Sequence, residues 1–563
     1  MTIKCILFFN EFDILENSNW IGKMGKIFKI IFYKINRKIS KNNIINFVPN
    51  FFGISFLLVI LWFWGINKIN RKKIEIFEHD LLNQITNTTH LNQHIYNKWH
   101  RCEYSSFSKL EKCMKIKVPL NWEDKNSEKI GFFIKRYGED NPKKIILILS
   151  GGPGGIGNSY LSLAKEFYEH DKSSLILMPD HRGTGYSENL HCPNDKRTLS
   201  IQDIDNNKFA SCFDYLKSKW PDKLKHFNSY QAGQDIHALI NLYPNVPIYL
   251  YASSYGTIWA QRVLNKKNLN IKKVYLESPF IAGKNNFLER NLEAALFSFY
   301  DNCKQAKYCN DKIQVNNLNS LKKLFRDTAN QKTCSAQFNQ NTRELIAKNS
   351  LWLLQYNYTA PLFALLISGI KHCDEQLIIN IFKYKSEINV TEIGNFKYSI
   401  YLHYNIFCNE IIGNFKNNNA TIKEFGFIEN YINKCQYVPF YSNESSEQSF
   451  KNLNMNTLII SGEADISSTK EFALELKEKF INEKVKFIGV KNLAHIPLAF
   501  RINYEDFFEE KYLGAERCRL NILFEFFNEK NDWPNLGCLS EIYPPIYSSD
   551  NALKYYESIF NNS

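Results

Sequence analysis

The sequence lacks the short motifs of several common protein classes. It has no Cys-x-x-Cys pair and no histidine-rich cluster with the spacing of a zinc site. Its glycine-rich segment is not followed by Gly-Lys-Ser or Gly-Lys-Thr, which argues against a phosphate-binding P-loop. Internal repeats are also absent. We therefore expect no metal and no other cofactor.

Charged residues are absent from positions 44–66, and positions 51–66 are densely apolar. About 20 apolar residues span a bilayer as a helix. Positions 23–41 hold basic but no acidic side chains, and such segments stay on the cytoplasmic side. We therefore expect a cytoplasmic segment at 1–43, an uncleaved transmembrane signal anchor at 44–66, and a lumenal or extracellular remainder.

Two other interpretations of the apolar segment stay open. The first is a cleaved signal peptide with a late start at Met24, which would make the protein secreted, although no small-x-small cleavage site follows Ile66. The second is a buried core helix. Residues 1–75 carry 12 basic and 4 acidic side chains, a net +8 of the total +13. This basic excess suits anionic lipid headgroups, so we expect a membrane partner and no nucleic acid.

A serine stands where a predicted strand ends. The apolar residues 247–250 lead into Tyr251-Ala252-Ser253-Ser254-Tyr255-Gly256, and helical spacing follows. A nucleophilic serine on a tight strand-to-helix turn usually has the pattern G-x-S-x-G, and Ala252 replaces the first glycine. Alone, the pattern is also typical of ordinary turns. Ser254 becomes the candidate nucleophile because other strand ends agree with it.

A glycine-rich segment follows an earlier predicted strand. The apolar residues 144–149 run into Ser150-Gly151-Gly152-Pro153-Gly154-Gly155. Glycine allows backbone N–H groups to approach a ligand closely. In a hydrolase, the N–H groups of Gly152 and Tyr255 would form the oxyanion hole that holds the negative oxygen of a tetrahedral intermediate. The alternative is a flexible loop.

Two later strand ends supply partners for the serine. Residues 457–462 precede Glu463 and Asp465, and residues 485–490 precede His495. Serine, acid and histidine thus follow one another in the order that α/β-hydrolases use. His495 would take the proton of the serine, and Asp465 would fix the imidazole tautomer. Glu463 is the second candidate for the acid.

A further strand end carries Asp180, His181 and Arg182. We interpret Asp180 and Arg182 as structural residues that hold a turn beside the nucleophile. His181 precedes the serine in the chain, which disfavours a catalytic role for it.

As a set, these motifs resemble the tripeptidyl-aminopeptidase-like branch of the α/β-hydrolases, whose relatives include the prolyl aminopeptidases. The resemblance is carried by GGPGG, Asp-x-Arg-Gly-x-Gly-x-Ser, Ser-Tyr-Gly-Thr and Gly-Glu-x-Asp, and runs from about Trp99 to about Tyr543. The sequence departs from the pattern at Ala252 and at Ser150, where prolyl aminopeptidases often carry histidine. The resemblance implies an α/β-hydrolase fold, in which helices flank a mostly parallel central sheet.

The long interval between serine and acid predicts an insert. Residues 284–452 have few strand signals, so we expect a mainly helical cap between core segments 96–283 and 453–563, with a linker at 67–95. In the resembling family, acidic groups of the cap bind the free α-amino group of a peptide. We carry this role over to Glu410, and the alternative is a surface glutamate beside a disulfide.

The chain has 13 cysteines, and removing Cys5 on the predicted cytoplasmic side leaves an even number. The resemblance suggests four disulfides, Cys102–Cys113, Cys192–Cys212, Cys303–Cys309 and Cys518–Cys538, which fits a lumenal or extracellular site. N-glycosylation sequons begin at Asn87, Asn357, Asn389, Asn419, Asn443 and Asn561.

Together these observations predict a serine exopeptidase of the tripeptidyl or prolyl aminopeptidase type. It would act on peptides with a free N-terminus through an acyl-enzyme on Ser254. One alternative is a carboxylester hydrolase or lipase with the same triad and a different cap. Another is a catalytically silent α/β-hydrolase ectodomain, against which the complete triad argues.

Overall fold

The chain divides into two units, Met1–Asn83 and Gln84–Ser563, and the computed structural model describes residues of the second. The described residues are 99–102, 108–193, 206–266, 269–282, 289–356, 359–393, 398–412, 433–442, 450–451, 453–481, 483–490, 493–495, 510–541, 554 and 557. The segments predicted as cytoplasmic, anchor and linker lie outside them. None of the helices in the described part is long and apolar enough to cross a bilayer.

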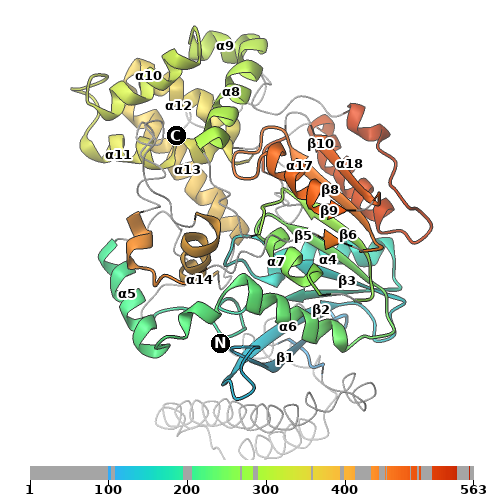
Figure 1. Cartoon of the computed structure of the whole chain (residues 1–563). Helices are drawn as coiled ribbons and strands as arrows, with labels where there is room; N and C mark the ends of the chain where they lie inside the picture. Colours follow the sequence, from blue (N-terminus) through green and yellow to red (C-terminus); the bar gives the residue numbers. More distant parts are fainter. Residues whose placement is uncertain are drawn as a thin grey trace, which may run out of the picture. The chain divides into compact units, whose positions relative to one another are not determined.

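An eight-stranded sheet forms the core, in the order β1-β2-β4-β3-β5-β6-β8-β10 (Figure 1). The strands β1 and β2 pair antiparallel, as do β2 and β4, and every other pair is parallel. The central strands are buried along their whole length, which explains their continuous apolar sequences. The strands are β1 (Glu111–Pro119), β2 (Lys129–Tyr137), β3 (Lys144–Leu149), β4 (Ser174–Pro179), β5 (Ile248–Ser253), β6 (Ile271–Glu277), β8 (Asn456–Gly462) and β10 (Val485–Val490).

Helices cover the sheet because each parallel connection needs a crossover. Side chains of α4 and α18 join one face of the strands in a single buried cluster, in which Phe167 stacks on Phe527. The helices α6 and α7 lie on the opposite face in Figure 1. The core helices are η3 (Gly157–Tyr160), α4 (Leu161–His170), α5 (Asn206–Lys219), η4 (Leu224–His226), α6 (Ser229–Asn241), α7 (Gly256–Leu264), α17 (Lys470–Lys479), α18 (Glu510–Phe526) and η9 (Gly537–Glu541).

The stretch between β6 and β8, called the insert below, is helical in its described part apart from β7 (Phe450–Lys451), which pairs with β9 (Phe480–Ile481). Its first helices share a hydrophobic core of their own, centred on the buried Phe363, whose ring contacts Phe299 and Phe325. The elements are α8 (Glu289–Gln305), α9 (Lys307–Ile313), α10 (Leu318–Ala329), α11 (Gln340–Asn349), η5 (Leu351–Leu354), α12 (Ala360–His372), α13 (Glu375–Ile393), α14 (Ile400–Ile406), η6 (Phe407–Ile411) and η7 (Lys434–Tyr437).

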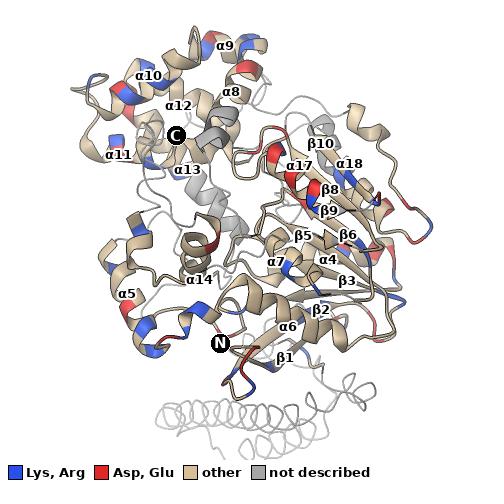
Figure 2. Cartoon of the chain, in the orientation of Figure 1, with Lys and Arg blue, Asp and Glu red and all other residues tan. Residues whose placement is uncertain are grey.

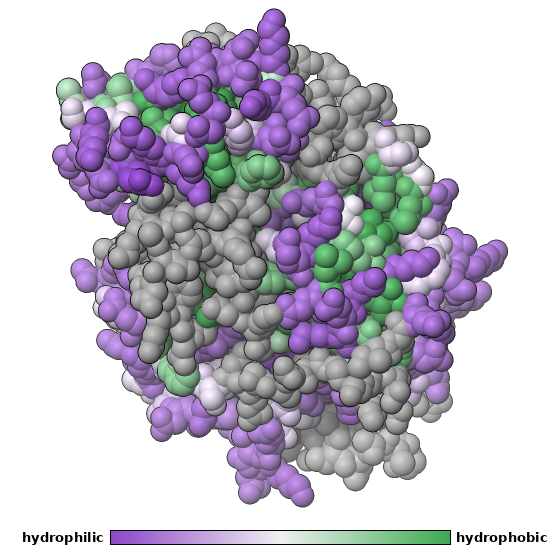
Figure 3. Space-filling view, turned by 45° about the horizontal axis from the view of Figure 1, so that its top comes forward, coloured by the Kyte–Doolittle hydropathy of each residue, from purple (hydrophilic) through white to green (hydrophobic). Residues whose placement is uncertain are grey.

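Basic and acidic residues both occur along α9, α10 and α11 (Figure 2). On the face drawn in Figure 3, hydrophilic residues cover most of the described surface of these helices, and hydrophobic residues are visible between them. This is the amphipathic pattern of helices that pack on one side and face water on the other.

Six disulfides join the described cysteines, and four of them are the predicted pairs Cys102–Cys113, Cys192–Cys212, Cys303–Cys309 and Cys518–Cys538. The other two, Cys334–Cys373 and Cys408–Cys435, lie within the insert. So many disulfides are typical of extracellular or lumenal proteins. The sequon residue Asn389 lies in α13, but its side chain and the other five sequon positions lie outside the described residues. Glycosylation stays a prediction.

Candidate active site

Ser254 occupies the sharp turn between β5 and α7 with a backbone φ of +56°. The room available on either side of Ser254 explains where the turn requires a glycine and where it accepts an alanine. A Cβ on Gly256 would lie 2.3 Å from the Leu149 carbonyl oxygen, so this position excludes any side chain. Ala252 is fully buried in β5 opposite Leu149, and its methyl group is accommodated there. The turn therefore tolerates the replacement of the first glycine but not of the second.

The turn brings Ser254 to the two late residues predicted to act with it. Its Oγ lies 3.0 Å from His495 Nε2, and His495 Nδ1 lies 2.8 Å from Asp465 Oδ2. Because the ionised Asp465 can only accept, Nδ1 carries the imidazole proton and Nε2 accepts from the serine hydroxyl. All three side chains are less than a tenth exposed.

The acid and the histidine are each held by backbone contacts. The second carboxylate oxygen of Asp465 accepts hydrogen bonds from the backbone N–H groups of Ser467 and Ser468, both at 2.8 Å. The backbone N–H of His495 donates to the Gln355 carbonyl just after η5, so the insert helps to place the imidazole. Glu463, the second candidate acid, instead forms an ion pair with Lys470 at 2.8 Å.

The predicted oxyanion donors flank the nucleophile. A Cβ on Gly151 would lie 3.0 Å from Ser254 Cβ, so the glycine-rich loop passes directly against the serine. Within the described residues, the backbone N–H groups of Gly152 and Tyr255 donate no hydrogen bond to another residue. These two groups are thus available to an oxygen bound beside Ser254.

A family model described as "alpha/beta hydrolase fold" matches residues 144–351, a stretch that includes the glycine-rich loop and Ser254. The order of the sheet and the order of serine, acid and histidine agree with it. The chain has the α/β-hydrolase fold. No curated protein matches the sequence.

Several solved structures are similar to this chain. A serine hydrolase from Cycloclasticus zankles is 13% identical, covers 74% of this chain and 100% of its own, and has a TM-score of 0.32. An esterase from Thermogutta terrifontis is 11% identical, with coverages of 68% and 92% and a TM-score of 0.29. A 2-hydroxy-6-oxo-6-phenylhexa-2,4-dienoate hydrolase from Rhodococcus sp. strain RHA1 is 14% identical, with coverages of 68% and 92% and a TM-score of 0.30. At these values the neighbours carry no information on the activity of this chain.

His181 lies beside the nucleophile turn without touching Ser254. Its Nδ1 donates to the Arg182 carbonyl at 2.6 Å, and its Nε2 accepts from the Tyr255 hydroxyl at 3.0 Å. Burial disfavours the charged form, and the nearby Arg182 guanidinium adds to this, so the pKa of His181 falls to about 3. His181 therefore stays neutral and supports the side chain of Tyr255, whose backbone N–H is one of the two candidate oxyanion donors.

The buried His181 predicts how stability depends on pH. Its pKa is about 3 in the folded protein against an ordinary 6.5, so only the unfolded chain gains this proton as the pH falls below 6.5. The free energy of unfolding should therefore decrease as the pH is lowered. The contribution of His181 to this decrease should be about 2 kcal/mol between pH ~6.5 and pH ~5. Urea unfolding at several pH values should show a flatter profile for His181→Asn than for the wild type, and parallel profiles would contradict the assignment.

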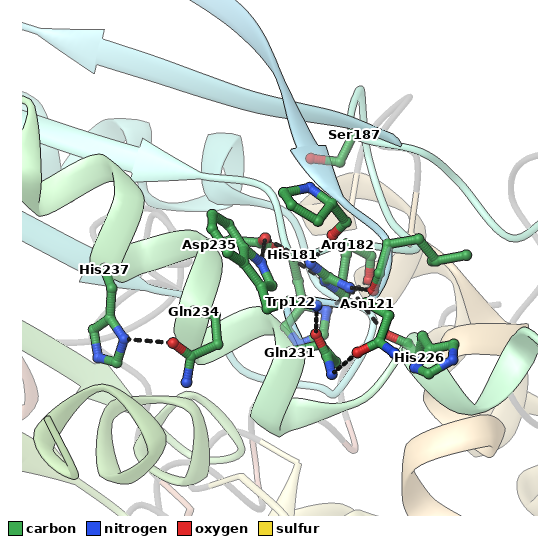
Figure 4. Close-up of polar contacts among 12 residues, drawn as sticks. Asn121, Trp122, His181, Arg182, Ser187, His226, Gln231, Gln234, Asp235 and His237 are labelled. Atoms are coloured by element: carbon green, nitrogen blue, oxygen red, sulfur yellow. Dashed lines mark hydrogen bonds and ion pairs between the residues drawn. The ribbon is translucent and has the colours of Figure 1, made fainter. Parts of the chain in front are cut away.

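Arg182 and Asp235 form a fully buried ion pair behind this turn (Figure 4). Two guanidinium nitrogens of Arg182 donate to the two carboxylate oxygens of Asp235, at 2.8 and 2.6 Å. The remaining donors reach the carbonyl oxygens of Pro119, Leu120 and His226. Asp235 also accepts from Trp122 Nε1 at 2.8 Å. The pair thus ties the turn after β4 to the end of β1 and to α6, which confirms that Arg182 is structural.

Asp180 also has a structural position. One carboxylate oxygen accepts from the backbone N–H of Gly157, and the other accepts from that of Tyr186, both at 2.8 Å. A Cβ on Gly185 would lie 2.0 Å from this carboxylate, so the glycine leaves the room that Asp180 fills.

Glu410 is buried in η6, a π-helical turn that continues α14. Its Oε1 accepts from the backbone N–H of Ser229 and from the Tyr441 hydroxyl, both at 2.9 Å. Its Oε2 accepts no hydrogen bond from any described residue. Burial, reinforced by the negative charge of Glu410, raises the pKa of Tyr255 well above its usual range. The Ser229 hydroxyl accepts from Arg262 Nε at 3.0 Å, which connects Glu410 through Ser229 with α7, the helix that follows Ser254.

Sequence reasoning missed the tyrosine that orients Glu410. Tyr441 lies 31 residues further along the chain and follows no recognisable motif. Only the fold brings it there, through Asn409, whose side chain accepts from the Tyr441 backbone N–H at 3.0 Å. Among the described residues, no cluster of three or more His, Cys, Asp or Glu side chains could hold a metal ion.

Proposed function

We propose that this α/β-hydrolase is a serine exopeptidase that cleaves peptides near a free N-terminus. The observation that carries the hydrolytic part is the chain of two hydrogen bonds from Ser254 through His495 to Asp465. Three such side chains, buried together at strand ends, form an activated nucleophile with its base and the group that orients the base.

The reaction follows from these positions. As Ser254 Oγ attacks the carbonyl carbon of the scissile bond, its proton passes to His495 Nε2. The N–H groups of Gly152 and Tyr255 stabilise the negative oxygen of the tetrahedral intermediate. His495 then returns the proton to the leaving amine, which breaks the peptide bond and leaves an ester on Ser254. Water hydrolyses this ester with His495 again acting as the base.

Preference for a free N-terminus rests on Glu410. A buried carboxylate oxygen without a hydrogen-bond partner is costly. The α-amino group of a peptide carries a positive charge with three N–H donors, so it would supply the missing hydrogen bond and add its positive charge to that of Arg262, whose Nε donates to the Ser229 hydroxyl at 3.0 Å. Glu410 is connected through Ser229 with α7, which begins two residues after Ser254, so we expect an amine bound there to leave the first residues of the peptide within reach of Ser254. This position favours the aminopeptidase branch over an esterase.

The test offers the full-length protein one set of peptides with free N-termini and the same set acetylated. We expect cleavage of the free set alone, with products read by mass spectrometry. Replacing Glu410 by Gln should lower kcat/KM on the free peptides by about tenfold to a hundredfold, the value of one charge-assisted hydrogen bond. Hydrolysis of a simple activated ester should be unaffected by the same substitution.

Two control variants accompany this test. Ser254→Ala should abolish both activities, and Glu344→Gln removes a carboxylate of the insert that is paired on the surface with Lys348, so it should change neither. Equal cleavage of free and acetylated peptides would contradict the exopeptidase proposal. Hydrolysis of esters without any peptide cleavage would favour the carboxylester hydrolase.

A further inference from the structure

The insert contacts the glycine-rich loop through the segment that begins α14. The carbonyl oxygen of Pro153 accepts from the Tyr398 hydroxyl at 2.8 Å and lies 2.9 Å from His403 Nδ1. The next carbonyl, that of Gly154, accepts from the backbone N–H of Ser399 at 3.1 Å and from the Thr184 hydroxyl at 2.7 Å. Two successive carbonyls of the loop are therefore held from outside the loop.

The donor state of His403 follows from its partner. The Nδ1 of His403 lies 2.9 Å from the Tyr398 hydroxyl as well as 2.9 Å from the Pro153 carbonyl oxygen. Because a carbonyl oxygen can only accept, the hydrogen bond between His403 and Pro153 places the proton on Nδ1, and the Tyr398 hydroxyl donates to the same carbonyl. Burial lowers the pKa of His403 to about 4, which keeps the ring neutral near neutral pH. The ring is also stacked on Phe407 at 5.5 Å between centroids, so its orientation is defined by packing as well as by the hydrogen bond.

Close packing leaves the loop little freedom at this contact. Gly154 has a φ of +100°, and a Cβ there would lie 2.4 Å from the Ser399 carbonyl oxygen. The Ser399 hydroxyl accepts from the backbone N–H of Leu402 at the start of α14 and donates to the Leu190 carbonyl of the core at 2.7 Å. The start of α14 is thus attached both to the loop and to the core.

The same element carries Glu410 at its other end. The helix α14 continues without a break into η6, and Asn405 near the end of α14 donates to the carbonyl oxygens of Leu224 and Phe227 at 3.2 and 3.1 Å. One continuous element therefore connects the loop with the carboxylate proposed to bind the substrate amine.

We propose that Tyr398 and His403 are positioning residues that hold the Pro153 carbonyl, and thereby fix the Gly152 N–H toward the oxygen developing beside Ser254. The inference rests on the proposed function only in its acyl-transfer chemistry, not in its preference for peptides. Pro153 is joined directly to Gly152, so a rotation of this part of the loop would turn the Gly152 N–H away from the oxyanion. The insert would then complete the oxyanion hole as well as admit the substrate.

The test compares Tyr398→Phe and His403→Phe, which keep an aromatic ring and lose the donor. An activated ester and its thiono analogue serve as substrates, because a sulfur anion accepts hydrogen bonds more weakly than an oxygen anion. Each variant should lower kcat on the oxygen ester by about tenfold, less than the ~100-fold or more that loss of a whole oxyanion donor costs. KM should change little, and the rate ratio of oxygen to sulfur ester should fall with kcat.

Two further variants separate positioning from simple stability. His403→Asn places an amide N–H near the former Nδ1 and should restore most of the lost kcat and of the oxygen preference. Tyr300→Phe removes another tyrosine hydroxyl of the insert that donates to a backbone carbonyl, that of Asn316 at 2.7 Å, and should leave both unchanged.

An unchanged ratio of oxygen to sulfur ester would overturn the inference, even if the melting temperature fell, because the two residues would then be merely structural. A wild type that hydrolyses the esters but cleaves no peptide would contradict the exopeptidase proposal alone, since the ester ratio tests the loop without any peptide.

Discussion

Replacing His495 by alanine should lower kcat by about a millionfold while the protein stays folded. The expected loss is large because Nε2 of His495 is 3.0 Å from Ser254 Oγ, and without it the hydroxyl keeps its proton. In the variant Asp465 keeps the backbone N–H groups of Ser467 and Ser468 as partners, so the melting temperature should change little. Turnover of a free-amine peptide, measured at substrate saturation, checks the prediction.

The matched control is His191→Ala, which removes an exposed histidine of the same core and should leave kcat unchanged. The double variant with Ser254→Ala should be no slower than either single variant, because the two side chains act as one unit. Residual activity within about tenfold of the wild type would rule out His495 as the general base.

Replacing Asp235 by alanine should lower the free energy of unfolding by about 3–5 kcal/mol. The pair with Arg182 has no solvent exposure on either side chain, so the guanidinium would stay buried with two donors unpaired. The indole N–H of Trp122 would lose its acceptor as well. Chemical denaturation at constant pH measures the change.

A surface pair provides the comparison. Asp214 and Lys217 form an ion pair at 3.2 Å with side chains 74% and 44% exposed. Asp214→Ala should therefore cost about 1 kcal/mol or less, since water screens exposed pairs. If both variants lost equally little stability, the buried pair would not hold the turn after β4 as we describe.

Local sequence was sufficient to locate the central strands and the three residues of the candidate triad. The run 144–149 coincides with β3 because a parallel strand covered by helices is apolar along its length. The run 485–490 coincides with β10, an edge strand that is only partly buried. Ser254, Asp465 and His495 could be found because each follows such a strand, and the carboxyl ends of parallel strands meet at one edge of the sheet.

Other features left no comparable signal. The sequence motifs did not predict β6. This strand nevertheless helps to position the serine, because the carbonyl oxygen of Glu277 at its end accepts a hydrogen bond from the backbone N–H of Ser254. The pairs Cys334–Cys373 and Cys408–Cys435 are separated by 39 and 27 residues, and spacing alone does not select among so many cysteines. The resemblance suggested only the four pairs at shorter separation.

The sequence by itself determined the α/β-hydrolase core, the order of the three candidate triad residues and the glycine-rich loop beside them. The periodicity of apolar residues, the position of a residue at a strand end and small residues at turns are local properties, so they can be recognised in the sequence alone. Only the tertiary structure decided that Asp465 rather than Glu463 meets the histidine, and that Glu410 has one oxygen held by Tyr441. It also brought Tyr398 and His403 to Pro153, about 250 residues earlier in the chain. Contacts of this kind depend on how the helices of the insert pack on the core, and no local sequence pattern predicts that packing.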